Sequence, residues 1–192
     1  MNQRLNLWPV TPPGFDASLG QPEPSLTLYP TDSPRGAVLV LPGGGYCHKA
    51  AHEGGPVCER FNAAGYFSAV LDYRVAPYLA PIPQWDAQRA VQLLRYIAPE
   101  YGYAPSRIAI LGFSAGGHLA ASAAYLDIPL PDAGDVISRQ PWRPDAAILC
   151  YPVITMGPFT HEGSRDNLLG AGADGAGIHA WSVEEHITPG AP

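Results

Sequence analysis

Three short runs of consecutive apolar residues constrain the fold of this chain more than any other feature. They are GAVLVLP at 36–42, RIAILGF at 107–113 and DAAILCYPV at 145–153. A β-strand that is apolar at nearly every position must be buried on both faces, and such strands are typical of parallel sheets covered by helices. Two further strands are expected, at 66–74 (YFSAVLDYR) and within SLTLYP at 25–30.

Helical patterns occupy the intervals between these strands. Helices are expected near 55–64 and from about 115 to 125, and the clearest one follows the proline-rich stretch APYLAPIP. Its apolar residues keep the spacing of one helix face: Ala87, Ala90, Val91, Leu94 and Ile97. Its polar residues are expected to face the other way: Gln88, Arg89, Gln92 and Arg95. Pro99 is expected to help end this helix. The alternation of strands and helices predicts an α/β fold, a parallel sheet with helices on both faces.

One serine lies where this architecture can expose a nucleophile. Ser114 stands inside Gly-x-Ser-x-Gly, directly after a predicted strand and directly before a predicted helix. A sharp turn at such a point presents the serine hydroxyl at the top of the sheet. The small residues that permit the turn are Gly112, Ala115, Gly116 and Gly117. The alternative is that Ser114 only caps the helix.

A glycine-rich loop follows an earlier strand at LPGGGY, 41–46. We expect the backbone amides of Gly44 and Gly45, together with that of Ala115, to form an oxyanion hole. A phosphate-binding loop and a plain tight turn are the alternatives. The stretch lacks the Gly-Lys-Ser/Thr ending of a P-loop and the spacing of a dinucleotide fingerprint, which argues against a nucleotide.

Charge and composition exclude several classes of partner. The net charge of −6, with scattered basic residues, argues against nucleic acid and against an anionic membrane surface. The N-terminus MNQRLNLWPV has no signal-peptide pattern. The longest apolar run, 146–156, is well short of the ~20 residues that a membrane span needs. We therefore expect a cytoplasmic protein whose three cysteines are free thiols: Cys47, Cys58 and Cys150.

The sequence blocks resemble those of a known family, the α/β-hydrolase fold serine esterases, and within it the acetyl-esterase and acetylxylan-esterase-like group. Blocks similar to that group occur in its order: PGGGY, HE at 52–53, LDYRVAP, DAQRAVQLLR, RIAILGFSAGGHLAAS, YPVITM and GSRDNLLG. Pro42 stands where relatives of hormone-sensitive lipase have histidine. The resemblance implies a carboxylic ester hydrolase without a cofactor, acting on small acyl esters such as acetylated plant-polysaccharide sugars. It also implies Ser114 as nucleophile, with Gly44, Gly45 and Ala115 as oxyanion donors.

A serine nucleophile needs a histidine and an acid, which in this fold follow in the order serine, acid, histidine. The resemblance places the acid after the strand that follows DAAILCYPV, and the histidine one strand later. Residues 154–192 are polar and glycine-rich, with one short helix expected near WSVEEH (181–186). We therefore expect a single domain, 1–192, incomplete at its C-terminus and lacking the last two strands. The acid and base would lie beyond residue 192, and an oligomer or second chain would cover the open sheet edge.

The histidines leave alternatives open. His118, one turn into the helix after Ser114, is expected to be a buried structural residue. A compact triad using His161, His179 or His186 is the competing hypothesis. A metal site is not expected, because His48, His52 and Glu53 do not form His-Glu-x-x-His and no third ligand is evident. Two other functions remain open: a peptidase or amidase of the same fold, and a non-catalytic hydrolase-like binding protein.

Overall fold

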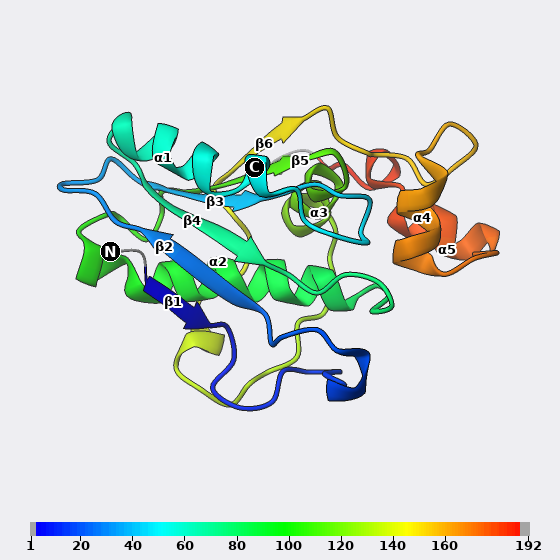
Figure 1. Ribbon diagram of the computed structural model, residues 1–192, viewed down its shortest axis with the longest axis horizontal. Coiled ribbons are helices and arrows are strands. Elements are labelled where there is room, and N and C mark those ends of the chain that lie inside the picture. The colour runs from blue at the N-terminus through cyan, green and yellow to red at the C-terminus, as the bar shows by residue number, and fades with distance from the viewer. Residues whose placement is uncertain (1–2, 189–192) are drawn as a thin grey trace.

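The computed structural model describes residues 3–188, which form a six-stranded sheet with helices on both faces (Figure 1). The strand order is β1-β2-β4-β3-β5-β6. The strands are β1 (Gln3–Asn6), β2 (Ser25–Tyr29), β3 (Ala37–Leu41), β4 (Phe67–Asp72), β5 (Ile108–Phe113) and β6 (Ala146–Cys150). Strands β3 to β6 are parallel, and β1 and β2 extend one edge as antiparallel strands. The predicted α/β fold is confirmed, and each predicted strand is present.

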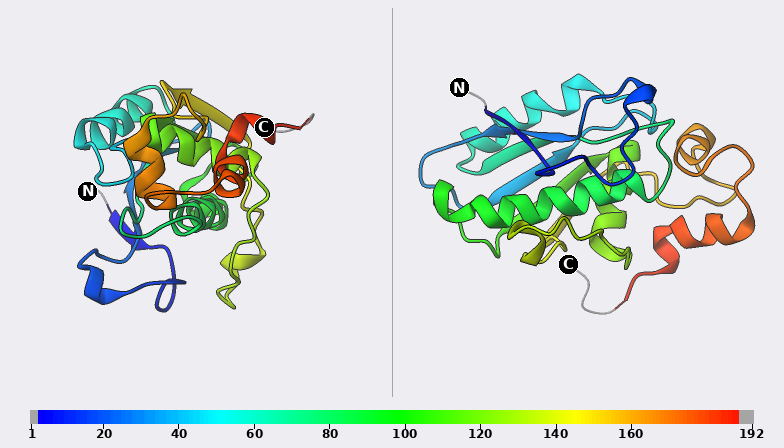
Figure 2. Two further views of the ribbon diagram at one scale, coloured as in Figure 1. Left: turned by 90° about the vertical axis from the view of Figure 1, so that its right-hand side faces the viewer. Right: turned by 90° about the horizontal axis from the view of Figure 1, so that it is seen from below.

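Helices cover the two faces of the sheet unequally. They are α1 (Gly55–Ala63), α2 (Ile82–Tyr101), α3 (Ser114–Tyr125), α4 (Glu162–Leu169) and α5 (Gly175–Trp181). Val38 and Val40 of β3 pack against Cys58 of α1 on one face. Leu39 and Leu41 join the larger core on the other face, with side chains of α2 and α3. Figure 2 shows α2 and α1 on opposite sides of the sheet. Both faces of β3 are therefore buried, as its continuous apolar run predicts.

The polar side of α2 is also buried, which its amphipathic pattern alone does not indicate. The segment 126–145 lies over this side and accepts its hydrogen bonds. Gln92 donates to the Gln140 carbonyl at 2.8 Å, and Arg95 bonds to Asp145 at 2.9 Å. Arg89, which is fully buried, forms an ion pair with Asp135. Buried polar groups of this kind need partners, and here a distant segment supplies them.

Pro99 lies inside α2 and does not end it, contrary to the expectation from the sequence. The helix continues to Tyr101 and stops where Gly102 adopts a left-handed conformation with φ of 78°. Glycine takes this conformation without the steric cost that other residues incur. The glycine, rather than the proline, therefore marks the C-terminus of this helix.

The strand β1 and two C-terminal helices were not predicted. Strand β1 has the sequence QRLN and no fully buried residue, so it carries no apolar signal. After β6, the described residues contain α4 and α5, and a 3-10 turn at Val183–Glu185 lies within the predicted WSVEEH helix. Strand β6 pairs only with β5 within residues 3–188, and Ile148 on it is 39% exposed.

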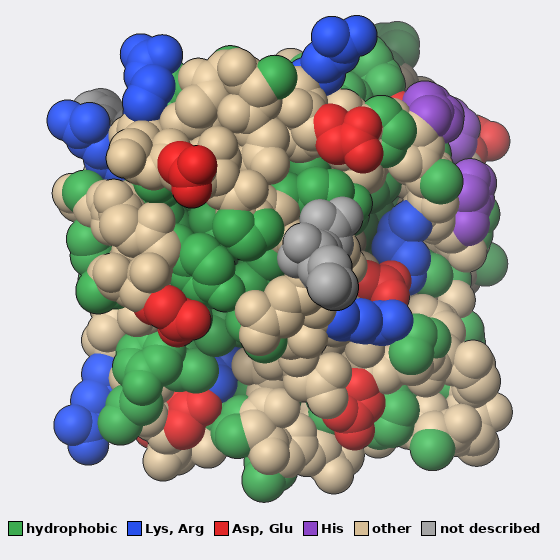
Figure 3. Space-filling view, turned by 60° about the vertical axis from the view of Figure 1, so that its left-hand side comes forward, with side chains coloured by type: hydrophobic (Ala, Val, Ile, Leu, Met, Phe, Trp, Pro, Cys, Tyr) green, Lys and Arg blue, Asp and Glu red, His purple; other side chains and the backbone are tan. Residues whose placement is uncertain are grey.

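The surface carries both signs of charge. On the face shown in Figure 3, basic and acidic side chains are interspersed around apolar ones. Across residues 3–188, no helix combines the length and the apolar character that crossing a membrane requires.

Candidate active site

The predicted nucleophile lies at a sharp turn between β5 and α3. Strand β5 ends at Phe113 and the helix begins at Ser114, whose φ is +50°. A non-glycine residue held in this region stores roughly 1–3 kcal/mol of strain, and such residues concentrate at functional sites. The geometry is that of the strand-to-helix turn which exposes a nucleophilic serine.

Close backbone contacts explain the glycines around Ser114. A Cβ atom on Gly112 would lie 2.0 Å from the Gly116 carbonyl oxygen, and one on Gly116 would lie 2.3 Å from the Leu41 carbonyl oxygen. A Cβ on Gly117 would lie 2.8 Å from Cβ of Pro152. The turn therefore fits against β3 and the end of β6 only because these residues lack side chains.

The glycine loop after β3 lies directly against this turn. A Cβ on Gly43 would be 3.1 Å from Cβ of Ser114. Gly44 and Gly45 both have positive φ, 134° and 62°. Within the described residues, their two amides form no hydrogen bond, whereas the Gly43 amide donates to Glu53 Oε2 at 2.7 Å. Ala115 is buried in the first turn of α3, where an amide has no acceptor within its own helix.

Two cavities meet at Ser114. One, of about 420 Å³, lies between Ser114 and the segments 151–155 and 159–161. The other, of about 500 Å³, includes Gly44, Gly45 and Ser114 in its wall. Tyr151 and His161 line both cavities. The structure therefore brings the predicted nucleophile and the two loop glycines to one cavity.

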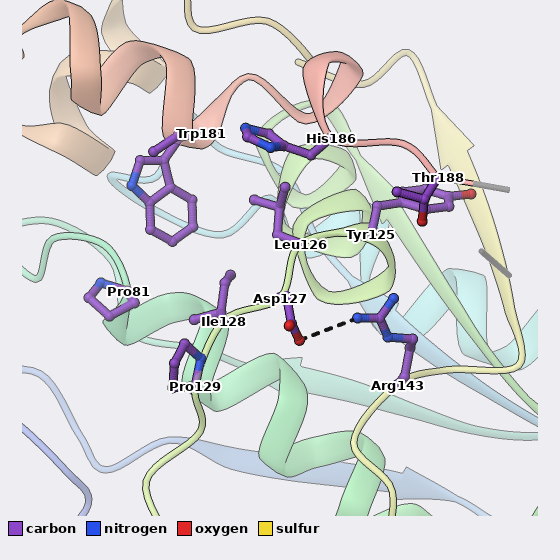
Figure 4. Close-up of a pocket in the computed structure, with 11 residues that line it drawn as sticks. Pro81, Tyr125, Leu126, Asp127, Ile128, Pro129, Arg143, Trp181, His186 and Thr188 are labelled. Atoms are coloured by element: carbon purple, nitrogen blue, oxygen red, sulfur yellow. Dashed lines mark ion pairs between the residues drawn. The ribbon is translucent and has the colours of Figure 1, made fainter. Parts of the chain in front are cut away.

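A larger cavity lies elsewhere. It has a volume of about 690 Å³ and is lined by apolar side chains such as Leu126, Ile128 and Trp181, with the Asp127–Arg143 ion pair at 3.6 Å beside them (Figure 4). It shares no lining residue with the two cavities at Ser114. It is therefore not part of the site around the predicted nucleophile.

His118 is buried, as predicted. Its ring nitrogens lie 2.8 Å from the Tyr46 hydroxyl and 2.8 Å from the Trp181 carbonyl oxygen. Burial lowers the pKa of His118 to about 4, so the ring is neutral at pH 7. These contacts hold α3 to the glycine loop and to the end of α5, and they leave no ring nitrogen for Ser114.

The three histidines of the competing hypothesis are not equivalent. His161 lines both cavities at Ser114, and its Nδ1 lies 2.9 Å from the Ser164 hydroxyl and caps α4. His179 pairs with Glu185, and His186 contacts the His179 carbonyl oxygen. These last two histidines line neither cavity. Within residues 3–188, the Ser114 hydroxyl forms no hydrogen bond to a histidine.

Glu53 and Tyr151 belong to the site although the sequence did not single them out for it. The Glu53 side chain is buried, its Oε2 accepts the Gly43 amide, and its Oε1 accepts the Tyr151 hydroxyl at 2.7 Å. Tyr151 has a φ of 36° and is 67% exposed. The only sequence signal was the position of Glu53 in the HE block, ten residues after Gly43. His52, the other residue of that block, is exposed, and its Nε2 lies 3.8 Å from Glu53 Oε1.

The chain matches the BD-FAE family over residues 28–135, more than half of its length. It is 34% identical over 194 residues to endo-1,4-beta-xylanase B of Butyrivibrio fibrisolvens, a match that covers 98% of this chain and 31% of that protein. It is 32% identical to the acetylxylan esterase of Xylanibacter ruminicola, over 85% of this chain and 34% of that protein. The chain thus spans about a third of the length of these two relatives.

A solved structure extends the likeness to three dimensions. The acetyl ester-xyloside bifunctional hydrolase from Caldicellulosiruptor lactoaceticus matches with a TM-score of 0.88 and 39% identity, over 97% of this chain and 70% of that one. The resemblance drawn from the sequence blocks is confirmed by these matches. The chain belongs to the BD-FAE family and has the fold of the α/β-hydrolase esterases.

Proposed function

We propose that Ser114 is the nucleophile of a carboxylic ester hydrolase that acts on short acyl esters. The observation that carries the proposal is the strained turn at Ser114, φ +50°, packed against a glycine loop in which two amides are unpaired within the described residues. Strain and unpaired backbone donors both cost stability, and a site for acyl transfer gives a use to each of them.

In this mechanism the Ser114 hydroxyl attacks the ester carbonyl carbon, and the carbonyl oxygen becomes an oxyanion. The amides of Gly44, Gly45 and Ala115 stabilise that oxyanion, and each donor of this kind contributes about 3–4 kcal/mol in the transition state. The tetrahedral intermediate expels the alcohol and leaves an acyl group on Ser114. Water then attacks the acyl-enzyme and releases the acid. No cofactor takes part in these steps.

We infer that the base and the acid that activate Ser114 lie outside the described residues. In residues 3–188 the serine bonds to no histidine, and His161, which lines the same cavities, has its Nδ1 on Ser164 rather than on a carboxylate. A serine hydroxyl without a base is a weak nucleophile because its proton has no acceptor during the attack. Two further strands carrying an acid and a histidine would complete the site.

Acetyl esters on xylan-type sugars are the substrates that we propose. The support is the likeness to proteins named acetylxylan esterase and acetyl ester-xyloside hydrolase. We expect acetyl esters to be hydrolysed faster than esters of long fatty acids.

Turnover by the full gene product tests this proposal. We expect hydrolysis of p-nitrophenyl acetate and no comparable cleavage of the matching anilide, which an amidase of the same fold would cleave. Ser114→Ala should reduce kcat to the residual rate that binding and the oxyanion hole leave. Ser106→Ala, an exposed serine before the opposite end of β5, is the matched control. Wild-type kcat in Ser114→Ala would refute the assignment, and no reaction by any form would favour the non-catalytic binding protein.

A further inference from the structure

Glu53 joins two parts of the site that are far apart in sequence. One carboxylate oxygen accepts the Gly43 amide at 2.7 Å, and the other accepts the Tyr151 hydroxyl at 2.7 Å. The residue is 8% exposed and its side chain 11% exposed, so neither bond competes freely with water. Hydrogen bonds to an ionised acceptor are short and strong. The carboxylate therefore links the glycine loop after β3 to the residue that follows β6.

The bond to Gly43 decides which loop amides remain free. Because the Gly43 amide points at Glu53, it cannot also point at an oxyanion on Ser114. A Cβ on Gly43 would lie 2.9 Å from Glu53 Oε2 and 3.1 Å from Cβ of Ser114, so this residue lies between the carboxylate and the nucleophile. Because the backbone is continuous, the fixed position of Gly43 constrains the positions of the next two amides, those of Gly44 and Gly45.

The bond to Tyr151 fixes a side chain that lines both cavities at Ser114. Tyr151 has an unfavourable φ of 36° and is two-thirds exposed, and its ring contacts Phe113 at 5.8 Å between centroids. An exposed tyrosine in this conformation needs something to hold it. Glu53 supplies that contact, and the hydrogen bond to its carboxylate raises the pKa of Tyr151 to about 12.

We propose that Glu53 is a positioning residue of the oxyanion site. Its carboxylate fixes the positions of the glycine loop and of Tyr151 relative to Ser114. The proposal rests on the esterase function proposed above. Glu53 does not touch the reacting atoms. It acts by orienting the Gly44 and Gly45 amides, and a displacement of about 1 Å in such a donor can cost about 100-fold in rate.

Substitutions at Glu53 separate hydrogen bonding from charge. Glu53→Gln can still accept the Gly43 amide with its carbonyl oxygen and can donate to the Tyr151 oxygen with its amide, so we expect kcat within about fivefold of wild type. Glu53→Ala loses both bonds, and we expect kcat to fall about 10- to 100-fold. We expect KM to change less than about threefold, because oxyanion contacts form only in the transition state. Glu59→Ala, an exposed glutamate on α1, is the matched control.

A titration of Tyr151 tests the geometry without turnover. We expect the phenol pKa, followed by absorbance against a Tyr151→Phe reference, to fall from about 12 toward its ordinary value of 10.0 in Glu53→Ala. Near-UV circular dichroism of each variant shows whether the fold is retained. If Glu53→Ala does not fold, the comparison of Glu53→Gln with Tyr151→Phe still tests the positioning role of Glu53. Glu53→Gln should keep kcat near that of the wild type, whereas Tyr151→Phe should lower it.

Unchanged kcat in folded Glu53→Ala, together with loss of activity in Ser114→Ala, would overturn the positioning role and leave the esterase intact. A rise in KM with unchanged kcat would also overturn it, since Glu53 would then serve ground-state binding. Activity that persists in Ser114→Ala would instead refute the proposed function, so the two failures can be told apart.

Discussion

Replacing Gly116 with alanine would push the nucleophile turn away from strand β3. The new Cβ would lie 2.3 Å from the Leu41 carbonyl oxygen and 2.6 Å from that of Pro42, about 1 Å short of ordinary van der Waals contact. Both atoms belong to the backbone, so no side-chain rotation can relieve the overlap. The turn that carries Ser114 and the segment that leads into the glycine loop would therefore have to separate.

The cost follows from this geometry. Overpacking of this kind destabilises a fold by about 1–3 kcal/mol, and the better helix propensity of alanine returns at most about 1 kcal/mol. We expect a net loss of about 1–2 kcal/mol, which lowers Tm by about 2–8 °C in a domain of this size. Separating the serine from the oxyanion amides by about 1 Å should lower kcat about 100-fold.

Thermal unfolding and p-nitrophenyl acetate kinetics measure the two effects. Gly175→Ala is the matched control, because no atom of residues 3–188 lies within 4 Å of a Cβ at that helical position. It should leave kcat unchanged and keep or slightly raise Tm. A Gly116→Ala protein with the Tm and kcat of the wild type would refute the close packing of the turn against β3.

Three further predictions follow from the site and its surroundings. Gly44→Ala should impair activity far more than Gly45→Ala. A Cβ on Gly44 would lie 2.3 Å from the His48 carbonyl oxygen, whereas the nearest described atoms to a Cβ on Gly45, Cys47 Sγ and Ser164 Oγ, lie 3.9 Å away. Equal kcat in the two variants would contradict this expectation. The pKa of His118 is lowered from 6.5 to about 4, so the unfolded chain binds more protons between these values and stability should fall as pH drops from 6.5 to 4. The loss should reach about 3 kcal/mol and shrink in His118→Gln, and chemical denaturation across this pH range measures both. The 192-residue chain alone should form oligomers through the unpaired edge of β6, where Ile148 is 39% exposed. It should also hydrolyse p-nitrophenyl acetate slowly. A monomer by light scattering with fast, Ser114-dependent hydrolysis would instead favour a triad that uses His161.

The strands and the nucleophile turn were predictable because their signals are local. A continuous apolar run such as 37–41 is explained by burial on both faces, and Gly112 and Gly116 stand within four residues of each other in the sequence that forms the turn. The burial of the polar side of α2 was not predictable, because local periodicity cannot reveal that residues 126–145 cover it. In the sequence, Arg89 has the character of a surface residue. In the fold it is paired with Asp135, which lies 46 positions later in the chain.

The contacts that complete the site are non-local in the same way. Glu53 and Tyr151 are 98 positions apart, and no spacing rule connects them. His161 was weighed as a base, but its role as the cap of α4 depends on the course of the chain after β6, which no pattern indicated. The structure also distinguishes the loop amides, since the Gly43 amide donates to Glu53, whereas those of Gly44 and Gly45 form no hydrogen bond within residues 3–188.

Covalent labelling of Ser114 tests the central claim most directly. The full gene product is treated with a fluorophosphonate, which reacts quickly only with an activated serine, and the modified peptide is identified by mass spectrometry. The account predicts one adduct, on Ser114, which is absent in Ser114→Ala and retained in Ser106→Ala. Esterase activity together with an adduct on another residue, or an adduct that persists in Ser114→Ala, would contradict it.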